Sequence, residues 1–195
     1  ARELARERPL FVGGDHSITY SLFSAFSREF EHPGLLVVDA HADAAVTANM
    51  HHEAMNRELI DNGLLEKERL MIFGARKILP REQAFIKEKK IKVVGAEWVK
   101  REKIAFEALK DFIDGQKNLY ASFDIDALDP SIAPGTGTRE KGGINEQQAF
   151  EIIEMLIESK KMRGFDLVEI NPRMDVNGKT VALGRKIMEK LFSEW

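Results

Sequence analysis

Four of the five histidines of this chain lie in three short polar clusters, at residues 13–17 (GGDHS), 39–43 (DAHAD) and 50–53 (MHHE). A fourth cluster, at 122–130 (SFDIDALDP), contains three carboxylates and no histidine. Imidazole nitrogens and carboxylate oxygens are ligands for divalent metal ions, and both groups also transfer protons. The residue types therefore predict a metal centre that is rich in oxygen ligands.

The clusters that begin at residues 13, 39 and 122 directly follow apolar, β-prone runs. Six such runs predict strands at 9–12, 35–38, 70–73, 91–94, 118–123 and 164–168. Continuous apolar runs are typical of parallel strands that are buried on both faces. Parallel sheets bind ligands beyond the carboxyl ends of their strands, so we expect the polar clusters to converge there.

Segments with helical periodicity lie between most of these runs. They predict helices at 17–30, 80–90, 99–113, 146–159 and 180–192, with Pro80 at a first helical position and Asn145 as an N-terminal cap. The alternation predicts a three-layer α/β/α domain with a mostly parallel sheet and right-handed crossovers. No repeat or linker divides the chain, so we expect one domain over residues 1–195. The glycine-rich stretches at 135–138 and 142–143 predict a long loop that shapes the site.

Composition excludes several classes of function. The 29 basic and 32 acidic side chains give a net charge of −3, which provides no electrostatic basis for binding nucleic acid or an anionic membrane. The chain has no cysteine, so disulfides, thiolate ligands and a cysteine nucleophile are ruled out. Its apolar runs are too short to span a bilayer, and a cytoplasmic protein is expected. Residues 1–8 resemble the end of a helix already under way, so an N-terminal segment is expected to be missing.

The clusters offer more ligands than one ion uses. If the DAHAD segment stays extended, Asp39, His41 and Asp43 point to one side of it, and the same geometry applies to Asp124 and Asp126. With the histidine of the first cluster, the candidate ligands are His16, Asp39, His41, Asp43, Asp124 and Asp126. Two ions that share bridging carboxylates would use this set and would activate a water between them.

The ligand chemistry favours manganese over zinc, because zinc prefers four ligands that are richer in nitrogen or sulfur. Iron, cobalt and nickel remain alternatives. A structural interpretation is also open for single residues, since Asp15 and Ser17 could simply cap the following helix. Crowded like charges at buried strand ends, however, repel one another unless a cation compensates them.

The motifs GGDHS, DAHAD and SFDIDALDP, in this order, resemble the signatures of the ureohydrolase superfamily of arginase, agmatinase and formimidoylglutamase. The segment at 168–172 (VEINP) resembles the fourth conserved block of that family, so the similarity extends from about Leu10 to the C-terminus. It implies an arginase-like fold, two Mn²⁺ ions per subunit and a homo-oligomer, either a trimer or a hexamer. The implied reaction is attack of a metal-bridging hydroxide on a guanidinium carbon, which releases urea and an amine.

The resemblance also implies roles for single residues. One ion would be held by His16, Asp39, Asp43 and Asp124, and the other by Asp39, His41, Asp124 and Asp126. Asp39 and Asp124 would bridge the pair. Asp43 would also accept a proton and pass it to the departing amine, and Glu169 would pair with the substrate guanidinium.

The proton-relay histidine of the family is best matched by His51. Family members usually have a glycine after it, whereas this chain has His52, so a shift of one residue stays open.

The predicted substrate is agmatine, which would give putrescine and urea in polyamine biosynthesis. Arginases recognise the amino-acid head of arginine with polar residues in the loop after DAHxD, but here residues 44–49 (AAVTAN) are mostly apolar and Ala45 replaces a recognising asparagine. Thr47 and Asn49 could still form hydrogen bonds. The charged run at 139–141 (REK) replaces a usual proline, and Arg139 could meet a substrate carboxylate, which would favour arginase or formimidoylglutamase activity.

Two other classes of function stay open. The first is a metal-stabilised scaffold without catalysis, although the complete ligand set and Glu169 argue against it. The second is a binuclear phosphoesterase, for which Arg57 and Arg139 are the only nearby cations to hold phosphate.

Overall fold

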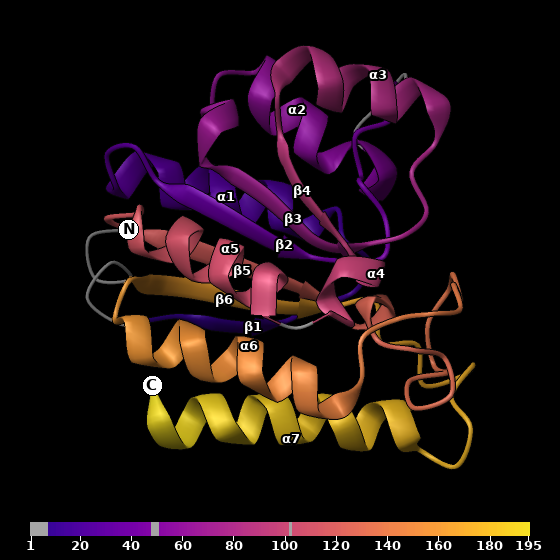
Figure 1. Ribbon diagram of the computed structural model, residues 1–195. Helices are drawn as coiled ribbons and strands as arrows, with labels where there is room; N and C mark the ends of the chain where they lie inside the picture. The colour runs from indigo at the N-terminus through magenta and orange to yellow at the C-terminus, as the bar shows by residue number, and fades with distance from the viewer. Residues whose placement is uncertain (1–7, 48–50, 102) are drawn as a thin grey trace.

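A parallel sheet of six strands forms the centre of the computed structural model, which describes residues 8–47, 51–101 and 103–195 (Figure 1). The strand order is β1-β6-β5-β2-β3-β4, and every neighbouring pair is parallel. The strands are β1 (Leu10–Val12), β2 (Gly34–Val38), β3 (Leu70–Ala75), β4 (Lys92–Gly95), β5 (Leu119–Asp124) and β6 (Met162–Val168). All six strands predicted from apolar runs are confirmed.

Helices cover both faces of the sheet. One layer contains α1 (Ile18–Glu29), α2 (Met55–Asp61) and α3 (Pro80–Lys89), as the upper part of Figure 1 shows. The other contains α4 (Ala96–Val99), α5 (Lys103–Asp114), α6 (Glu146–Ser159) and α7 (Lys179–Glu194). The predicted three-layer α/β/α fold is therefore confirmed. None of the described helices is long and apolar enough to cross a membrane.

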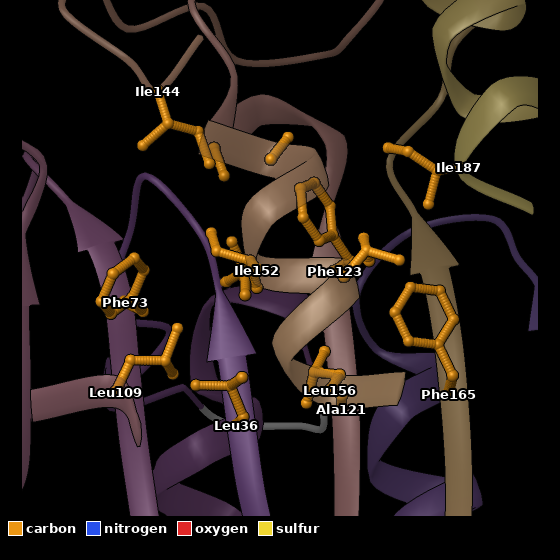
Figure 2. Packing of buried hydrophobic residues seen from close by; sticks show 14 of the residues in the cluster. Leu36, Phe73, Leu109, Ala121, Phe123, Ile144, Ile152, Leu156, Phe165 and Ile187 are labelled. Carbon is orange, nitrogen blue, oxygen red and sulfur yellow. The ribbon is translucent and has the colours of Figure 1, made fainter. Parts of the chain in front are cut away.

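The two layers bury two separate apolar cores, and the central strand β2 contributes to both. Leu36 and Val38 face the core under α5, α6 and α7, part of which Figure 2 shows. Leu35 and Val37 face the core under α1, α2 and α3. All five residues of β2 are buried, which explains why its sequence is apolar throughout instead of alternating.

The helices agree with the sequence prediction except in two places. The helix predicted at 99–113 corresponds to α5, which begins later, at Lys103, and the short helix α4 that precedes it was not predicted. The short helix α2 was missed. Pro80 begins α3 as predicted, and Asn145 caps α6 through a reciprocal pair of hydrogen bonds with Gln148. The helix expected at residues 1–8 falls almost wholly outside the described residues.

The chain reverses its direction across the sheet between β2 and β5. From β2 it proceeds outward through β3 to β4, and then returns to place β5 and β6 on the other side of β2. Loops that leave the carboxyl ends of β2 and β5 therefore diverge and leave a crevice between them. Such a switch point is the usual ligand site of an open α/β sheet.

Candidate metal centre

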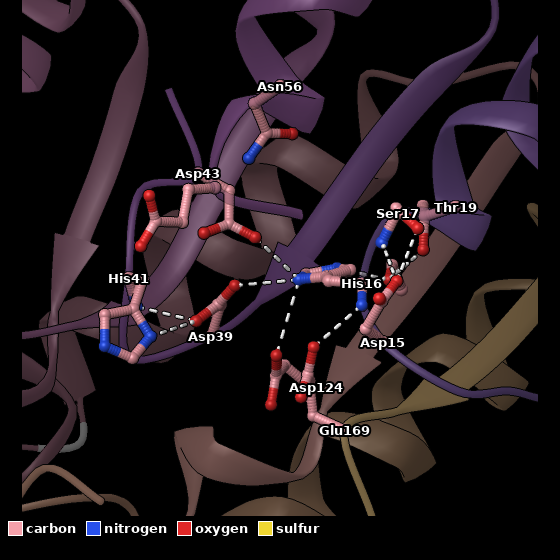
Figure 3. A network of polar contacts seen from close by, with 12 residues as sticks. Asp15, His16, Ser17, Thr19, Asp39, His41, Asp43, Asn56, Asp124 and Glu169 are labelled. Atoms are coloured by element: carbon pink, nitrogen blue, oxygen red, sulfur yellow. Dashed lines mark hydrogen bonds and ion pairs between the residues drawn. The ribbon is translucent and has the colours of Figure 1, made fainter. Parts of the chain in front are cut away.

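Two groups of candidate metal ligands lie at this switch point. His16, Asp39 and Asp124 form one group, which Figure 3 shows, and Asp39, His41 and Asp126 form the other. The groups therefore share Asp39. Within each group the ligand atoms all lie within 4.8 Å of one another. The arrangement is that of two adjacent cation sites with a common carboxylate.

The sheet explains why ligands from distant parts of the sequence meet. Asp39 follows β2 directly and Asp124 ends β5, and the preceding residues Val38 and Phe123 are partners in the parallel ladder. His16 arrives from the loop between β1 and α1. Each residue thus comes from the carboxyl end of a different strand.

The predicted extended geometry of the ligand segments is wrong. β2 ends at Val38, and Asp126 lies in the 3₁₀ turn η3 (Ile125–Ala127). In both segments the first aspartate folds the chain back, because its Oδ1 accepts a hydrogen bond from a backbone N–H two residues on. The N···O distance is 2.6 Å from His41 to Asp39 and 2.7 Å from Asp126 to Asp124. The turns bring the second ligand towards the first without period-two alternation.

Histidine nitrogens lie among the carboxylates. His16 Nδ1 lies 2.9 Å from Asp43 Oδ2, 3.1 Å from Asp39 Oδ2 and 3.4 Å from Asp124 Oδ2. His41 Nδ1 lies 3.0 Å from Asp126 Oδ2 and 3.3 Å from Asp39 Oδ1. Of these six residues only His41 is more than slightly exposed. The structure therefore brings all six predicted ligands together.

The protein alone compensates this concentration of negative charge poorly. Burial, together with repulsion from Asp39, raises the pKa of Asp43 to about 7. Burial and the neighbouring Asp126 raise the pKa of Asp124 well above its usual value. Burial would lower the pKa of His41, but Asp126 and Asp39 outweigh it and hold that pKa at about 11. The site takes up extra protons where cations are absent, as expected of carboxylates arranged for metal ions.

Two buried atoms indicate where an ion would bind. His16 Nδ1 and Asp39 Oδ2 have no hydrogen-bond partner, although they lie 3.1 Å apart as an ion pair, because the angles at that contact do not suit a hydrogen bond. Orphaned buried polar atoms are costly, and both belong to the candidate ligand groups. A divalent ion would satisfy them, so the residues fit a pair of metal ions.

A buried hydrogen-bond network orients His16 from behind. Its Nε2 lies 2.9 Å from Ser122 Oγ, which in turn donates a 2.5 Å hydrogen bond to Asp166 Oδ1. Tyr120 and Thr19 donate further hydrogen bonds to Asp166 Oδ2. If Nδ1 is to bind an ion, the proton of the neutral ring must lie on Nε2, and Ser122 Oγ can accept a hydrogen bond from it because its own hydrogen is donated to Asp166. Sequence reasoning missed Asp166, although a lone acid within the apolar run 164–168 is a usable signal.

A cavity of about 190 Å³ opens in front of the ligands. Glu169 lines it, directly after the last residue of β6, and its Oε1 accepts a 2.8 Å hydrogen bond from the backbone N–H of His16. Glu169 and Asp43 both have positive φ angles, 64° and 45°, which is costly for residues other than glycine. Such strain often accompanies function, and here it occurs at two of the residues predicted to be catalytic.

The two adjacent histidines lie at different places around the cavity. His52 is among the lining residues and His51 is not. The side chain of His51 is 49% exposed, and its ring lies 4.0 Å from that of His52. The structure therefore brings His52, and not His51, to the cavity wall.

Several wall residues were not among the predicted site residues. The structure adds Glu53, Lys77, Leu79, Glu82, Thr138 and Glu140 to the lining. Glu82 is buried, and its carboxylate accepts hydrogen bonds from the backbone N–H groups of Ala44 and Leu79. Thr138 and Glu140 come from the long loop predicted after the fourth cluster. That loop does shape the site, as expected from its glycines.

Three side chains considered at the sequence level lie elsewhere. Arg139 donates a 2.7 Å hydrogen bond to the carbonyl of Met174, and Arg57 donates to the carbonyl of Ala44. Neither lines the cavity among the described residues. Asn49 falls outside the described residues. Asp129, the third carboxylate of the fourth cluster, accepts hydrogen bonds from the backbone of Ser131 and of two glycines in the loop, so it has a structural role.

Comparison with known proteins identifies the family. The model of the Arginase family matches residues 2–193. The chain belongs to the arginase family. It is 38% identical over 192 residues to the mitochondrial agmatinase of Gallus gallus and 37% identical over 191 residues to the mitochondrial guanidino acid hydrolase of Homo sapiens. Its fold matches the arginase of Bacillus caldovelox with a TM-score of 0.86 at 28% identity, covering 99% of this chain and 74% of that one.

The curated relatives are considerably longer than this chain. The two alignments cover 94% of this chain in each case, but only 56% of the agmatinase and 54% of the guanidino acid hydrolase. The chain thus spans little more than half the length of the relatives that it matches.

The hydrogen bond behind His16 leads to a first prediction. Replacing Ser122 by alanine should weaken manganese binding about 10- to 100-fold, because His16 loses the group that fixes its tautomer and orientation. Isothermal titration with Mn²⁺ measures this. Ser159→Ala is the matched control, since its hydroxyl caps a carbonyl at the end of α6, and equal affinity in the two variants would contradict the role given to Ser122.

The perturbed pKa values lead to a second prediction for the metal-free protein. Folded Asp43 keeps its proton up to about pH 7 and folded His41 up to about pH 11, whereas the unfolded chain releases them near 4 and 6.5. The folded state therefore binds more protons across both windows, and stability falls as the pH rises through them. In EDTA the midpoint of thermal unfolding should be lower at about pH 9 than at about pH 6.

Saturating Mn²⁺ should reduce this pH dependence, because the ions replace the protons. If the metal-free protein in EDTA unfolded at the same temperature at both pH values, the raised pKa values of Asp43 and His41 would be contradicted.

Proposed function

We propose that this chain forms the catalytic centre of a binuclear manganese ureohydrolase that hydrolyses a guanidinium group to urea and an amine. The observation that carries the proposal is the pair of ligand groups that share Asp39, beside a cavity lined by Glu169. Family membership supports the reaction class. Two ions bound there would act as Lewis acids and lower the pKa of a water. Carboxylate-rich ligands favour manganese over zinc.

The residues of the chain supply the remaining chemistry. Glu169 offers a carboxylate to the planar guanidinium, whose forked N–H donors match it. Asp43 reaches the same point as the ligands and would accept the proton that the attacking water loses. A carbon–oxygen bond forms, the bond between the guanidinium carbon and the substituted nitrogen breaks, and this nitrogen leaves as the amine after taking up a proton. We assign the relay of that proton to the pair His51 and His52.

Agmatine is the first candidate substrate. The segment at 44–47 (AAVT) is mostly apolar, which suits a substrate without an amino-acid head. Two acidic side chains, Glu53 and Glu140, line the cavity and could receive the amine at the far end of agmatine. The similarity to an agmatinase at 38% identity supports the same choice.

A guanidino acid is the second candidate, and Lys77 favours it. Among the described lining residues Lys77 is the only lysine or arginine, and it pairs with no carboxylate of the described chain. A lysine in that position would attract a substrate carboxylate and repel an amine. The similarity to a guanidino acid hydrolase agrees with this alternative. Homo-oligomerisation and a cytoplasmic location stay predictions, and the names of both relatives place those proteins in mitochondria.

A third prediction tests the reaction class. Mn²⁺-loaded protein should release urea from agmatine, chelation should stop the release, and added Mn²⁺ should restore it. Asp124→Asn should lower kcat/KM at least about a hundredfold while the protein stays folded, because the group of His16, Asp39 and Asp124 loses a ligand charge. Asp114→Asn, an exposed aspartate far from the site, is the control.

Two results would contradict the proposal. If folded, Mn²⁺-loaded protein released no urea from agmatine, arginine or guanidinobutyrate, the result would favour the alternative of a metal-stabilised scaffold. Hydrolysis of an aryl phosphate in place of these substrates would indicate a phosphoesterase.

A fourth prediction separates the two substrates by the charge of their tails. If agmatine is the substrate, Lys77→Gln should lower its KM several-fold and Glu140→Gln should raise it, because opposite charges attract and like charges repel across a small cavity. For guanidinobutyrate both effects should reverse. The measurement is kcat and KM for both compounds with both variants. A KM that neither substitution changes would show that these two residues do not contact the tail.

A further inference from the structure

The side chain of Arg76 joins three separate segments behind the ligand site. Arg76 follows the last residue of β3 and is half-buried. Its guanidinium donates hydrogen bonds to the backbone carbonyls of Gly74 (3.4 Å), Asp126 (2.7 Å), Ala127 (3.0 Å), Leu128 (3.2 Å) and Glu140 (2.9 and 3.2 Å). One side chain thus holds the end of β3, the turn η3 and the loop at residue 140.

The guanidinium of Arg76 is satisfied by carbonyls alone. No carboxylate of the described residues forms an ion pair with it. In this it differs from Arg57, Arg69 and Arg185, which pair with exposed carboxylates. Apart from the carbonyl of Gly74 in β3, these carbonyls belong to the 3₁₀ turn η3, to Leu128 directly after it and to a loop, where regular secondary structure supplies few donors. Arg76 therefore supplies donors to several backbone carbonyls near the site, and of these Ala127 also accepts a hydrogen bond from the backbone N–H of Ile144.

The turn that Arg76 holds carries one of the candidate ligands. Asp126 contributes its carbonyl to Arg76, its Oδ1 to the backbone N–H of Ala40 at 3.2 Å and its Oδ2 to His41 Nδ1 at 3.0 Å. Its backbone and its side chain are therefore fixed from opposite directions. The same guanidinium also fixes the backbone of Glu140, whose side chain lines the cavity.

We propose that Arg76 is a positioning residue, which sets the place of Asp126 within the Asp39–His41–Asp126 ion site and ties the cavity wall at Glu140 to it. The inference rests on the proposed function, because it presupposes that these residues bind an ion. The group at His16 and Asp124 depends less on this arginine, since no described hydrogen bond joins Arg76 to either residue. Loss of Arg76 should thus affect the two ions unequally.

A lysine could not replace this arginine. The guanidinium presents its donors in a rigid planar fork, whereas an ammonium group is a compact point charge with donors on one atom. The carbonyls come from three segments and face different nitrogens of Arg76. Charge alone is therefore not expected to restore the arrangement.

The test is a comparison of manganese binding by the wild type, Arg76→Met, Arg76→Lys and Arg69→Met. Arg69 is the matched control, because it precedes β3 as Arg76 follows it, is also half-buried, and bonds to Glu66 and Gln116 away from the site. Isothermal titration gives the affinities, and electron paramagnetic resonance distinguishes a coupled manganese pair from single ions. Circular dichroism verifies that each variant is folded at the temperature used.

We expect the wild type and Arg69→Met to bind two ions as a coupled pair. Arg76→Met should bind one ion normally and the other about 10- to 100-fold more weakly, with loss of the coupled signal at limiting manganese. Arg76→Lys should show the same defect, and it takes the place of Arg76→Met if the latter does not fold.

Three outcomes would overturn the inference. If Arg76→Met or Arg76→Lys bound both ions with wild-type affinity, a positioning role would be excluded. If Arg69→Met lost as much manganese affinity as the Arg76 variants, the effect would reflect general stability and not positioning. If the wild type itself bound no pair of ions, the proposed function would fall, and this inference with it.

Discussion

The repulsion among four buried aspartates is the interaction on which the rest of the site depends. Asp39, Asp43, Asp124 and Asp126 lie around two histidines at the end of the central strands. Burial and repulsion from neighbouring carboxylates raise the pKa values of Asp43, Asp124 and Asp126, whereas His16 and His41 outweigh burial at Asp39 and lower its pKa. A fold tolerates such a group only if a cation or protons compensate the charge. The shared Asp39 places two cation positions side by side, which a hydrolase can use to activate a water and a scaffold has no need of.

The surrounding structure consists of devices that hold these charges in place. Asp39 and Asp124 each fold their own segment back through a backbone hydrogen bond, and Ser122 with Asp166 fixes His16 from the opposite side. Parallel strands orient all of these segments toward one edge, but they do not determine how each ligand side chain is oriented. That orientation comes from short turns, from the positive φ angles of Asp43 and Glu169, and from the hydrogen bonds that Arg76 donates to backbone carbonyls. Rigidity at the site is therefore built mostly outside regular secondary structure.

The sequence allowed the strands, the fold class and the convergence of the ligand set to be predicted, because each rests on local patterns. An apolar run such as 35–38 predicts a buried parallel strand, and a polar cluster after it predicts a site at the sheet edge. The turn at Asp126 was not foreseen, since a 3₁₀ turn and an extended strand can both contain Asp-Ile-Asp. Lys77, Glu82 and Arg76 were missed for another reason. Glu82 and Arg76 act through contacts with residues 38 and 50 to 64 positions away, and Lys77 through its place in the cavity wall, which no local pattern records.

The ion sites and the part of the cavity proposed to meet a substrate's far end have different structural origins in this protein. The ligands follow strands whose register is fixed by the apolar core, so a change in the core would disturb the ion sites. The side chains that could meet the far end of a substrate line the cavity from outside the strands and α-helices: Lys77 and Glu140 from loops, and Glu53 from the 3₁₀ turn at His52–Ala54. Loops can change without disturbing the sheet, which is how one fold can hydrolyse guanidinium groups with different tails. Glu140 is the exception, because its backbone is bonded to the arginine that also holds Asp126. A substitution that moves this part of the rim would be felt at the ion site, so here the two properties cannot vary independently.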